Sequence, residues 1–375
     1  MPGNWLTGWW KLRARDDGRA AGLYVSPRSV SAAVGQRRGE RVALDLRADP
    51  VDGLGAVAAC LRQQSQALGL GGTGCNLVLA PELYSVTLVE RPRVPDQEVK
   101  EAVRWRLQDS LDFSPDQAVI DVFPLPASAS REREMVFVVA VHRDTLRQVI
   151  EAAHGAGIRV AAVDVTELAL RNITHGLYPE PQWSVGLLRL TGASGVINIC
   201  RGEELFLSRR ISGMPAELSA DAWDEFKDRL LLQVQRSIDY YESAMGQQPC
   251  NALIVATTHG WQVQVCEYLD EMLPVAVRTV KDELAALFDV RLHNPEPVDI
   301  DWHDPSVAQR NAMTAALPAL GGALRSLMST SLRRSFNSLR SAGAQRRMMR
   351  AAISSLVSRE RRIALTTWCS AVASM

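Results

Sequence analysis

The sequence predicts an α/β protein made of two consecutive halves, each with its own strands and helices. Strand-like apolar runs alternate with segments of helical periodicity from residue 21 to residue 164, and a second series of strands begins at residue 184. The chain has 375 residues, enough for two or three domains, and its 47% hydrophobic content excludes a disordered chain.

The first half begins with two strands joined by the polar turn 35–39, which predicts a hairpin. The strands expected in this half are 21–34, 41–46, 76–80, 84–90, 118–123, 135–142 and 159–164. The helices expected are 54–68, 96–111 and 143–157. Asp96 is the expected N-cap of the second helix, and a glycine ends the third.

The second half repeats the pattern with fewer helices. Its expected strands are 184–189, 195–200, 204–211, 252–256 and 275–277, and its expected helices are 222–245 and 261–272. The long helix carries one apolar stripe, formed by Phe226, Leu230, Val234, Ile238 and Tyr241. The acidic, proline-rich segment 294–305 predicts a loop.

Charge and cysteine content exclude several classes of protein. The 42 basic and 42 acidic residues give a net charge of +0, which argues against a specific nucleic-acid partner. Six dispersed cysteines without CxxC or zinc-ligand spacing predict no disulfide framework, no metal site and a reducing compartment. No uncharged stretch approaches the roughly 20 residues of a membrane span, and the first 15 residues lack a secretory signal's apolar core.

A GxGxxG match is formed by Gly69, Gly71 and Gly74. A dinucleotide-binding loop follows a strand and opens a helix, whereas here a helix precedes the glycines and a strand follows them. We therefore expect a flexible helix-to-strand turn. GxSxG, HExxH, Walker A and EF-hand spacings do not occur in the sequence.

The N-terminal segment 1–19 combines aromatic and basic side chains, among them Trp5, Trp9, Trp10 and Lys11. Such a mixture suits contact with a membrane surface, where indole rings lie at headgroup level and cations meet anionic lipid. The alternative is a chain terminus whose tryptophans pack on the folded domain.

Several stretches of the chain resemble one family. Residues 78–125 resemble the inserted subdomain of the actin-like PilM proteins of type IV pilus assembly, especially the MshI branch of the mannose-sensitive haemagglutinin (MSHA) pilus. Residues 135–170, 233–243 and 314–325 resemble further segments of that family in the same order. The resemblance covers about residues 20–325. It implies an actin-like, ribonuclease H-like two-lobed fold with a small inserted α+β subdomain.

The resemblance also implies a degenerate nucleotide site. Actin-like ATPases hold ATP and Mg²⁺ between the lobes with a DxGxxxxK hairpin in each half, whose Asp orients metal and water. Alignment puts Tyr24, Ser26 and Ser31 at the Asp, Gly and Lys positions of the first hairpin, and Leu188 or Arg189 at the second Asp. Thr257 and Thr258 replace the glycine pair on the adenosine side. The expected protein is a pseudo-ATPase without cofactor, and ATP and Mg²⁺ remain its cofactors only if these hairpins are misaligned.

The function implied by the resemblance is structural. PilM-type proteins are cytoplasmic scaffolds, peripheral on the inner membrane, that bind the N-terminal segment of a bitopic PilN-like protein (MshJ in the MSHA system) and link it to the pilus assembly ATPases. The rim of the peptide groove is expected to include Arg104, Trp105 and Arg106. The alternative is that these three residues form a solvent-exposed helix face without a partner role. The alternatives are an active PilM-type ATPase and the actin-like domain of a GspL-type secretion protein.

The family resemblance and the composition of the two ends divide the chain into four parts, the first of which is the N-terminal segment 1–19. The first lobe is expected at 20–175, with the inserted subdomain at about 84–134, and the second lobe at 176–325. Residues 326–375 form a tail with nine arginines and one glutamate, which gives +8 and leaves −8 for the rest of the chain. The tail is either a basic segment for anionic lipid or an acidic partner, or the product of a shifted reading frame.

Overall fold

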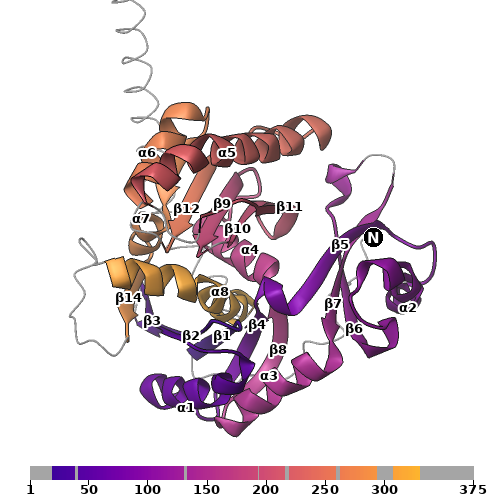
Figure 1. Cartoon of the computed structure of the whole chain (residues 1–375), viewed down its shortest axis with the longest axis vertical. Coiled ribbons are helices and arrows are strands. Elements are labelled where there is room, and N and C mark those ends of the chain that lie inside the picture. Colours follow the sequence, from indigo (N-terminus) through magenta and orange to yellow (C-terminus); the bar gives the residue numbers. More distant parts are fainter. Residues whose placement is uncertain are drawn as a thin grey trace, which may run out of the picture. The chain divides into compact units, whose positions relative to one another are not determined.

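The computed structural model of the chain describes residues 19–38, 41–130, 133–192, 194–215, 219–258, 262–293 and 307–329. The described strands form sheets of six, five and three strands (Figure 1). All three sheets lie in the first of two compact units, Met1–Met328. We call the six-stranded sheet with its helices the first lobe and the five-stranded sheet with its helices the second lobe. The predicted α/β class is confirmed.

The first lobe has the strand order β14-β3-β2-β1-β4-β8. Its strands are β1 (Arg19–Val25), β2 (Ser29–Arg38), β3 (Arg41–Pro50), β4 (Gly74–Leu79), β8 (Arg159–Val165) and β14 (Phe288–Leu292). The prediction of one strand over 21–34 was wrong, because β1 and β2 are antiparallel neighbours separated by a turn at residues 26–28. Ser26 and Pro27 make this turn, while the apolar pattern continues on both sides and hides it.

Two helices, α1 (Val57–Leu68) and α3 (Arg143–Gly155), cover the outer face of this sheet (Figure 1). Helix α1 ends at Gly69, whose φ of 61° is left-handed and favours glycine. The chain then turns through Gly72, at φ 73°, into β4. The glycine-rich segment is therefore a helix-to-strand turn, as predicted, and not a dinucleotide loop.

Helices α4 (Thr166–Leu177) and α8 (Val307–Ser329) lie between the two large sheets (Figure 1). Neither was predicted from periodicity. Nearly every side chain of α8 from 312 to 327 is buried, so the helix is apolar all round and shows no amphipathic period. A Cβ on Gly22 of β1 would lie 1.9 Å from the carbonyl oxygen of Ala319, so only glycine allows α8 this close.

The second lobe has the strand order β11-β10-β9-β12-β13. Its strands are β9 (Ser184–Thr191), β10 (Ser194–Arg201), β11 (Glu204–Ile211), β12 (Ala252–Thr257) and β13 (Ala276–Thr279). Its helices are α5 (Ala220–Asp239), α6 (Gln262–Met272) and α7 (Val280–Ala285). The predicted apolar stripe of α5 is buried in the core of this lobe, and the chain passes into a π turn, Tyr240–Ala244, instead of continuing as α-helix to 245.

The inserted subdomain contains the three-stranded sheet β5-β7-β6 and the short helix α2 (Val99–Arg104). Its strands are β5 (Tyr84–Glu90), β6 (Ala118–Pro124) and β7 (Met135–His142). Asp96 does not cap a helix. It opens a 3-10 turn, and its carboxylate pairs with Arg91 at 2.7 Å. The predicted helix 96–111 is therefore a chain of short α and 3-10 turns.

The predicted lobe boundaries do not coincide with the ends of the lobes in the structure. Strand β14 follows the second lobe in sequence but pairs in parallel with β3, so the chain returns to the first lobe near residue 288. Helix α8 continues to Ser329, and the side-chain amide of Asn76 donates to Ser326 Oγ at 2.9 Å, so the tail does not begin at 326. The predicted N-terminal segment to residue 18, the loop 294–305 and the tail from 330 lie outside the described residues.

The close contact between β1 and α8 predicts the effect of one methyl group. Gly22→Ala should lower the free energy of unfolding by about 3 kcal/mol, because backbone atoms on both sides must move apart. Gly71→Ala is the matched control, since a Cβ there meets nothing within 4 Å, and its effect should stay within about 0.5 kcal/mol. Urea unfolding measures both. Equal stability of the two variants would contradict the packing described.

Candidate functional site

The first predicted phosphate hairpin is formed by β1, β2 and their turn, and its side chains are already engaged. Ser26 Oγ accepts hydrogen bonds from the backbone amides of Arg28 and Ser29, at 3.1 and 2.8 Å. Ser31 is fully buried, and its hydroxyl donates to the carbonyl of Ala315 in α8 at 3.1 Å. Tyr24 is buried as well, with 4% of its surface exposed.

The second hairpin, β9 and β10, places two neighbouring residues on opposite faces of the sheet. Leu188 lies in the core of the second lobe and carries no polar group. Arg189 points to the other side, and its Nε donates to the carbonyl of Thr314 in α8 at 3.1 Å. Its guanidinium carbon lies 5.5 Å from the centre of the Tyr24 ring, in cation–π geometry. Arg189 thus contacts the first-lobe residue at the degenerate Asp position.

The carbonyl that Arg189 contacts is available because of Pro318. In an α-helix the carbonyl of residue 314 would accept from the amide of residue 318, and proline has no amide hydrogen. The hydroxyl of Thr314 donates to the carbonyl of Thr257 in β12 at 3.1 Å. The neighbouring Thr258 donates its amide to the carbonyl of Leu190 at 3.0 Å.

Of the predicted nucleotide positions, Ser31, Arg189 and Thr257 are bonded to the first half of α8, and Tyr24 contacts Arg189, whereas Leu188 faces the core of the second lobe and Ser26 bonds within its own turn. Burial raises the pKa of Tyr24, and the positive charge of Arg189 opposes that rise, so the phenol is neutral at ordinary pH. The side chains present are a phenol, hydroxyls bonded to protein groups and a buried guanidinium. The aligned positions offer Mg²⁺ no carboxylate, and their hydroxyl donors are already used. The carboxylates whose charges act on Tyr24 are those of Glu82 and Glu167, at other positions, and Glu167 is bonded to Tyr84. The side chains at the aligned positions do not fit a magnesium–nucleotide complex.

A second buried polar cluster lies where the inserted subdomain leaves the first lobe. Tyr84, the first residue of β5, donates its hydroxyl to Glu167 Oε2 at 2.5 Å and accepts from the Thr166 amide at 3.0 Å. Asn198 of the second lobe donates to the Glu167 carbonyl at 2.9 Å. Burial raises the pKa of Glu167, while the hydrogen bond from Tyr84 and the charge of Arg210 act in the opposite direction.

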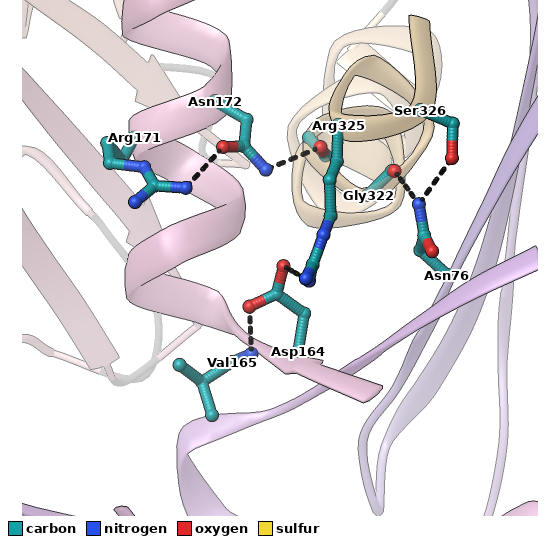
Figure 2. A network of polar contacts seen from close by, with 9 residues as sticks. Asn76, Asp164, Val165, Arg171, Asn172, Gly322, Arg325 and Ser326 are labelled. Atoms are coloured by element: carbon teal, nitrogen blue, oxygen red, sulfur yellow. Dashed lines mark hydrogen bonds and ion pairs between the residues drawn. The ribbon is translucent and has the colours of Figure 1, made fainter. Parts of the chain in front are cut away.

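The second half of α8 is held by polar contacts to the first lobe (Figure 2). Arg325 forms an ion pair with Asp164 at 2.6 Å, and the other carboxylate oxygen accepts from the Val165 amide. The side-chain amides of Asn76 and Asn172 donate to the carbonyls of Gly322 and Gly321, at 2.7 and 3.1 Å. These bonds set the position of α8 along its axis.

The three residues predicted for the groove rim do not act together. Arg104 is turned into the subdomain, where it donates to the carbonyls of Pro115 and Ala118 at 2.6 and 3.0 Å. Arg106 donates to the carbonyl of Glu90 at the end of β5. Trp105 projects outward, 66% exposed, and Arg106 is exposed as well. The predicted membrane contacts Trp5, Trp9, Trp10 and Lys11 lie outside the described residues.

Comparison with solved structures identifies the fold. A chain of the PilM–PilN type IV pilus biogenesis complex is 21% identical, with a TM-score of 0.60, over 82% of this chain and 98% of that chain. The cytoplasmic domain of EpsL, an inner-membrane component of the type II secretion system of Vibrio cholerae, is 14% identical at a TM-score of 0.40, over 79% and 94%. A Bacteroides thetaiotaomicron protein with actin-like ATPase fold is 9% identical at 0.45, over 71% and 92%.

This chain has the actin-like ATPase fold, as the resemblance implied. No protein-family model matches the chain, and no curated protein sequence matches it. Among the helices that the structure describes, none combines the length and apolar character needed to cross a bilayer. The described residues also contain no group of three or more His, Cys, Asp or Glu side chains placed to hold a metal ion.

Two parts of the site were missed from the sequence. The contribution of Thr314 depends on a backbone carbonyl, and the signal for it was Pro318 inside an apolar run that resembled the end of the family domain. The Glu167–Tyr84 pair joins residues 83 positions apart, and its signal was a carboxylate two residues after the end of β8. Both contacts become visible only when α4 and α8 are recognised as helices.

The raised pKa of Glu167 predicts a pH dependence of stability. In the folded state Glu167 stays protonated at pH values above 4.5, the ordinary pKa of its carboxyl group. The free energy of unfolding should therefore fall as pH rises from 4.5 through the raised pKa of Glu167. Glu167→Gln removes the titration while its amide oxygen still accepts from Tyr84, and should remove this part of the slope. Unfolding midpoints between about pH 4 and pH 8 measure it. The control is Glu82→Gln, at an exposed position. An unchanged slope in Glu167→Gln would contradict the assignment.

Proposed function

We propose that this chain is a non-catalytic scaffold in the inner-membrane assembly platform of a type IV pilus of the MSHA type, cytoplasmic and peripheral on that membrane. The observation that carries the proposal is the position of Arg189, whose guanidinium contacts both Tyr24 and α8, and the alignment puts Tyr24 and Arg189 at the two Asp positions of an actin-like ATPase. A fold shared with a chain of the PilM–PilN complex supports the pilus assignment.

Loss of nucleotide binding follows from the groups present. A triphosphate needs backbone and side-chain donors, and its Mg²⁺ needs oxygen ligands from an acidic residue or water. Ser31 would have to give up its bond to Ala315, and Arg189 its bond to Thr314, before either could contact a phosphate. Each exchange leaves a buried carbonyl without its donor, at a cost of about 1–3 kcal/mol.

The expected partner is the N-terminal segment of a PilN- or MshJ-like bitopic membrane protein, through which the scaffold would meet the pilus assembly ATPases. Strand β5 is an edge of the inserted sheet, where an extended peptide can add as a further strand. Leu88 in β5 is 39% exposed and lies opposite Phe137 of β7, which stacks on Phe123 of β6. This row offers apolar contact along an edge strand, so β5 replaces Arg104 and Trp105 as the preferred binding edge.

The nucleotide claim is tested with a fluorescent ATP analogue. In the presence of Mg²⁺ we expect no saturable binding up to about 1 mM, with an ATP-binding actin-fold protein as the positive control. Saturation in the micromolar range would contradict the proposal and favour an active PilM-type ATPase with misaligned hairpins.

The partner claim is tested with a synthetic peptide of the cytoplasmic N-terminal segment of a PilN-like protein. Leu88→Asp should weaken binding about tenfold or more, because a charge would be buried against the peptide. Trp105→Ala, on the exposed side of the subdomain, is the control and should bind as wild type. The reverse result would move the site to Trp105, and no binding by wild type would contradict the partner assignment.

A further inference from the structure

We infer that Arg189 and Thr314 form a built-in lock that holds the two lobes together without a ligand. Arg189 belongs to β9 of the second lobe, and its side chain contacts α8 and the ring of Tyr24 in β1 of the first lobe. One side chain therefore bridges both lobes at the position where the actin-like fold otherwise places a nucleotide. The groups that do not fit magnesium and phosphate fit each other.

A single residue of α8, Thr314, both accepts a hydrogen bond from the second lobe and donates one to it. The carbonyl of Thr314 accepts from Arg189 at 3.1 Å, and the hydroxyl of Thr314 donates to the carbonyl of Thr257 at 3.1 Å. Strands β9 and β12 are parallel neighbours, and Arg189 lies opposite Ala256, directly before Thr257. Thr314 is thus bonded to two adjacent strands of the second lobe, through its backbone and its side chain.

The lock does not depend on a ligand, because its acceptor is a backbone carbonyl of α8 that has no partner within the helix. Pro318 removes the amide that would otherwise pair with the Thr314 carbonyl, so this carbonyl needs another donor. Arg189 is 6% exposed, and a buried guanidinium in turn needs acceptors and a π surface. Each group satisfies the other, so separation of the lobes at this point would leave a carbonyl and a cation unpaired.

Two contacts farther along the lobes act in the same sense. Asn198 of β10 donates to the carbonyl of Glu167 in α4, which lies between the sheets, and Arg210 of β11 donates at 3.1 Å to the carbonyl of Pro81, which follows β4 of the first lobe. Besides Arg189, the bond from Arg210 thus joins the two lobes through protein groups alone. If the proposed scaffold role holds, partner binding through β5 is constitutive and is not gated by nucleotide-driven movement of the lobes.

Hydrogen–deuterium exchange of the full chain tests the lock at the amides of residues 312–317 in α8. Arg189→Gln should raise their exchange rate about tenfold, since a buried bond from a charged donor is lost, and the isosteric Thr314→Val about fivefold. Arg209→Gln is the matched control. That arginine also stacks on an aromatic ring, at 5.6 Å from Tyr240, but within the second lobe, and its removal should leave α8 unchanged.

The inference is overturned if both variants exchange at α8 within twofold of wild type. Should Arg189→Gln fail to fold, as judged by circular dichroism, Thr314→Val alone decides between these outcomes. Mg·ATP at about 1 mM should not alter exchange of α8 in wild type, and protection there would overturn the lock. Binding of an ATP analogue without any change at α8 would contradict only the non-catalytic proposal and would leave the lock standing.

Discussion

Helix α8 lies between the two large sheets, and the distance of its backbone from its neighbours constrains everything around it. A Cβ on Gly321 would lie 2.0 Å from the carbonyl oxygen of Ala169 in α4, and one on Gly322 would lie 3.0 Å from Val78 in β4. At these contacts backbone atoms pack directly against backbone atoms, so dispersion between them stabilises the core in addition to the packing of side chains. With α8 so close, the side chains of β1 and β9 meet directly across the space between the lobes.

Apolar packing alone leaves such a helix free to slide or rotate, and directional bonds remove that freedom. At one end the partner of α8 is Arg189, and at the other its partners are Asp164, which pairs with Arg325 of α8, and the side chains of Asn76 and Asn172 (Figure 2). A buried donor or acceptor without a partner is costly, so each bond favours one register of the helix over all others. The contacts of Arg189 and the architecture of the core are for this reason one structural feature.

The sequence predicted strands that form short apolar runs between turn residues, and helices whose burial is one-sided. Strands β9 to β11 follow from such runs, although β9 is buried along almost its whole length, and α5 follows from its apolar stripe, because one face of that helix packs and the other does not. Helix α8 is buried on nearly all sides, so it shows no amphipathic period. The site residues Tyr24, Ser31, Thr257 and Arg189 came from the family alignment. Their bonds to Ala315 and Thr314 of α8 did not, since Ser31 and Arg189 bond to backbone carbonyls that no side-chain pattern reveals.

The pairing of β14 with β3 also fixes how the molecule can be assembled. The first lobe is built from both ends of the described chain, and the second lobe is an insertion within it. Ser31 and its partner Ala315 are 284 residues apart, so such contacts carry a large loop-closure entropy and form late. During synthesis the inner face of β1 and β4 is made first and buried last, when α8 leaves the ribosome. The second lobe, with its own continuous sheet, can fold earlier and present β9 and β12 as the surface on which α8 completes the protein.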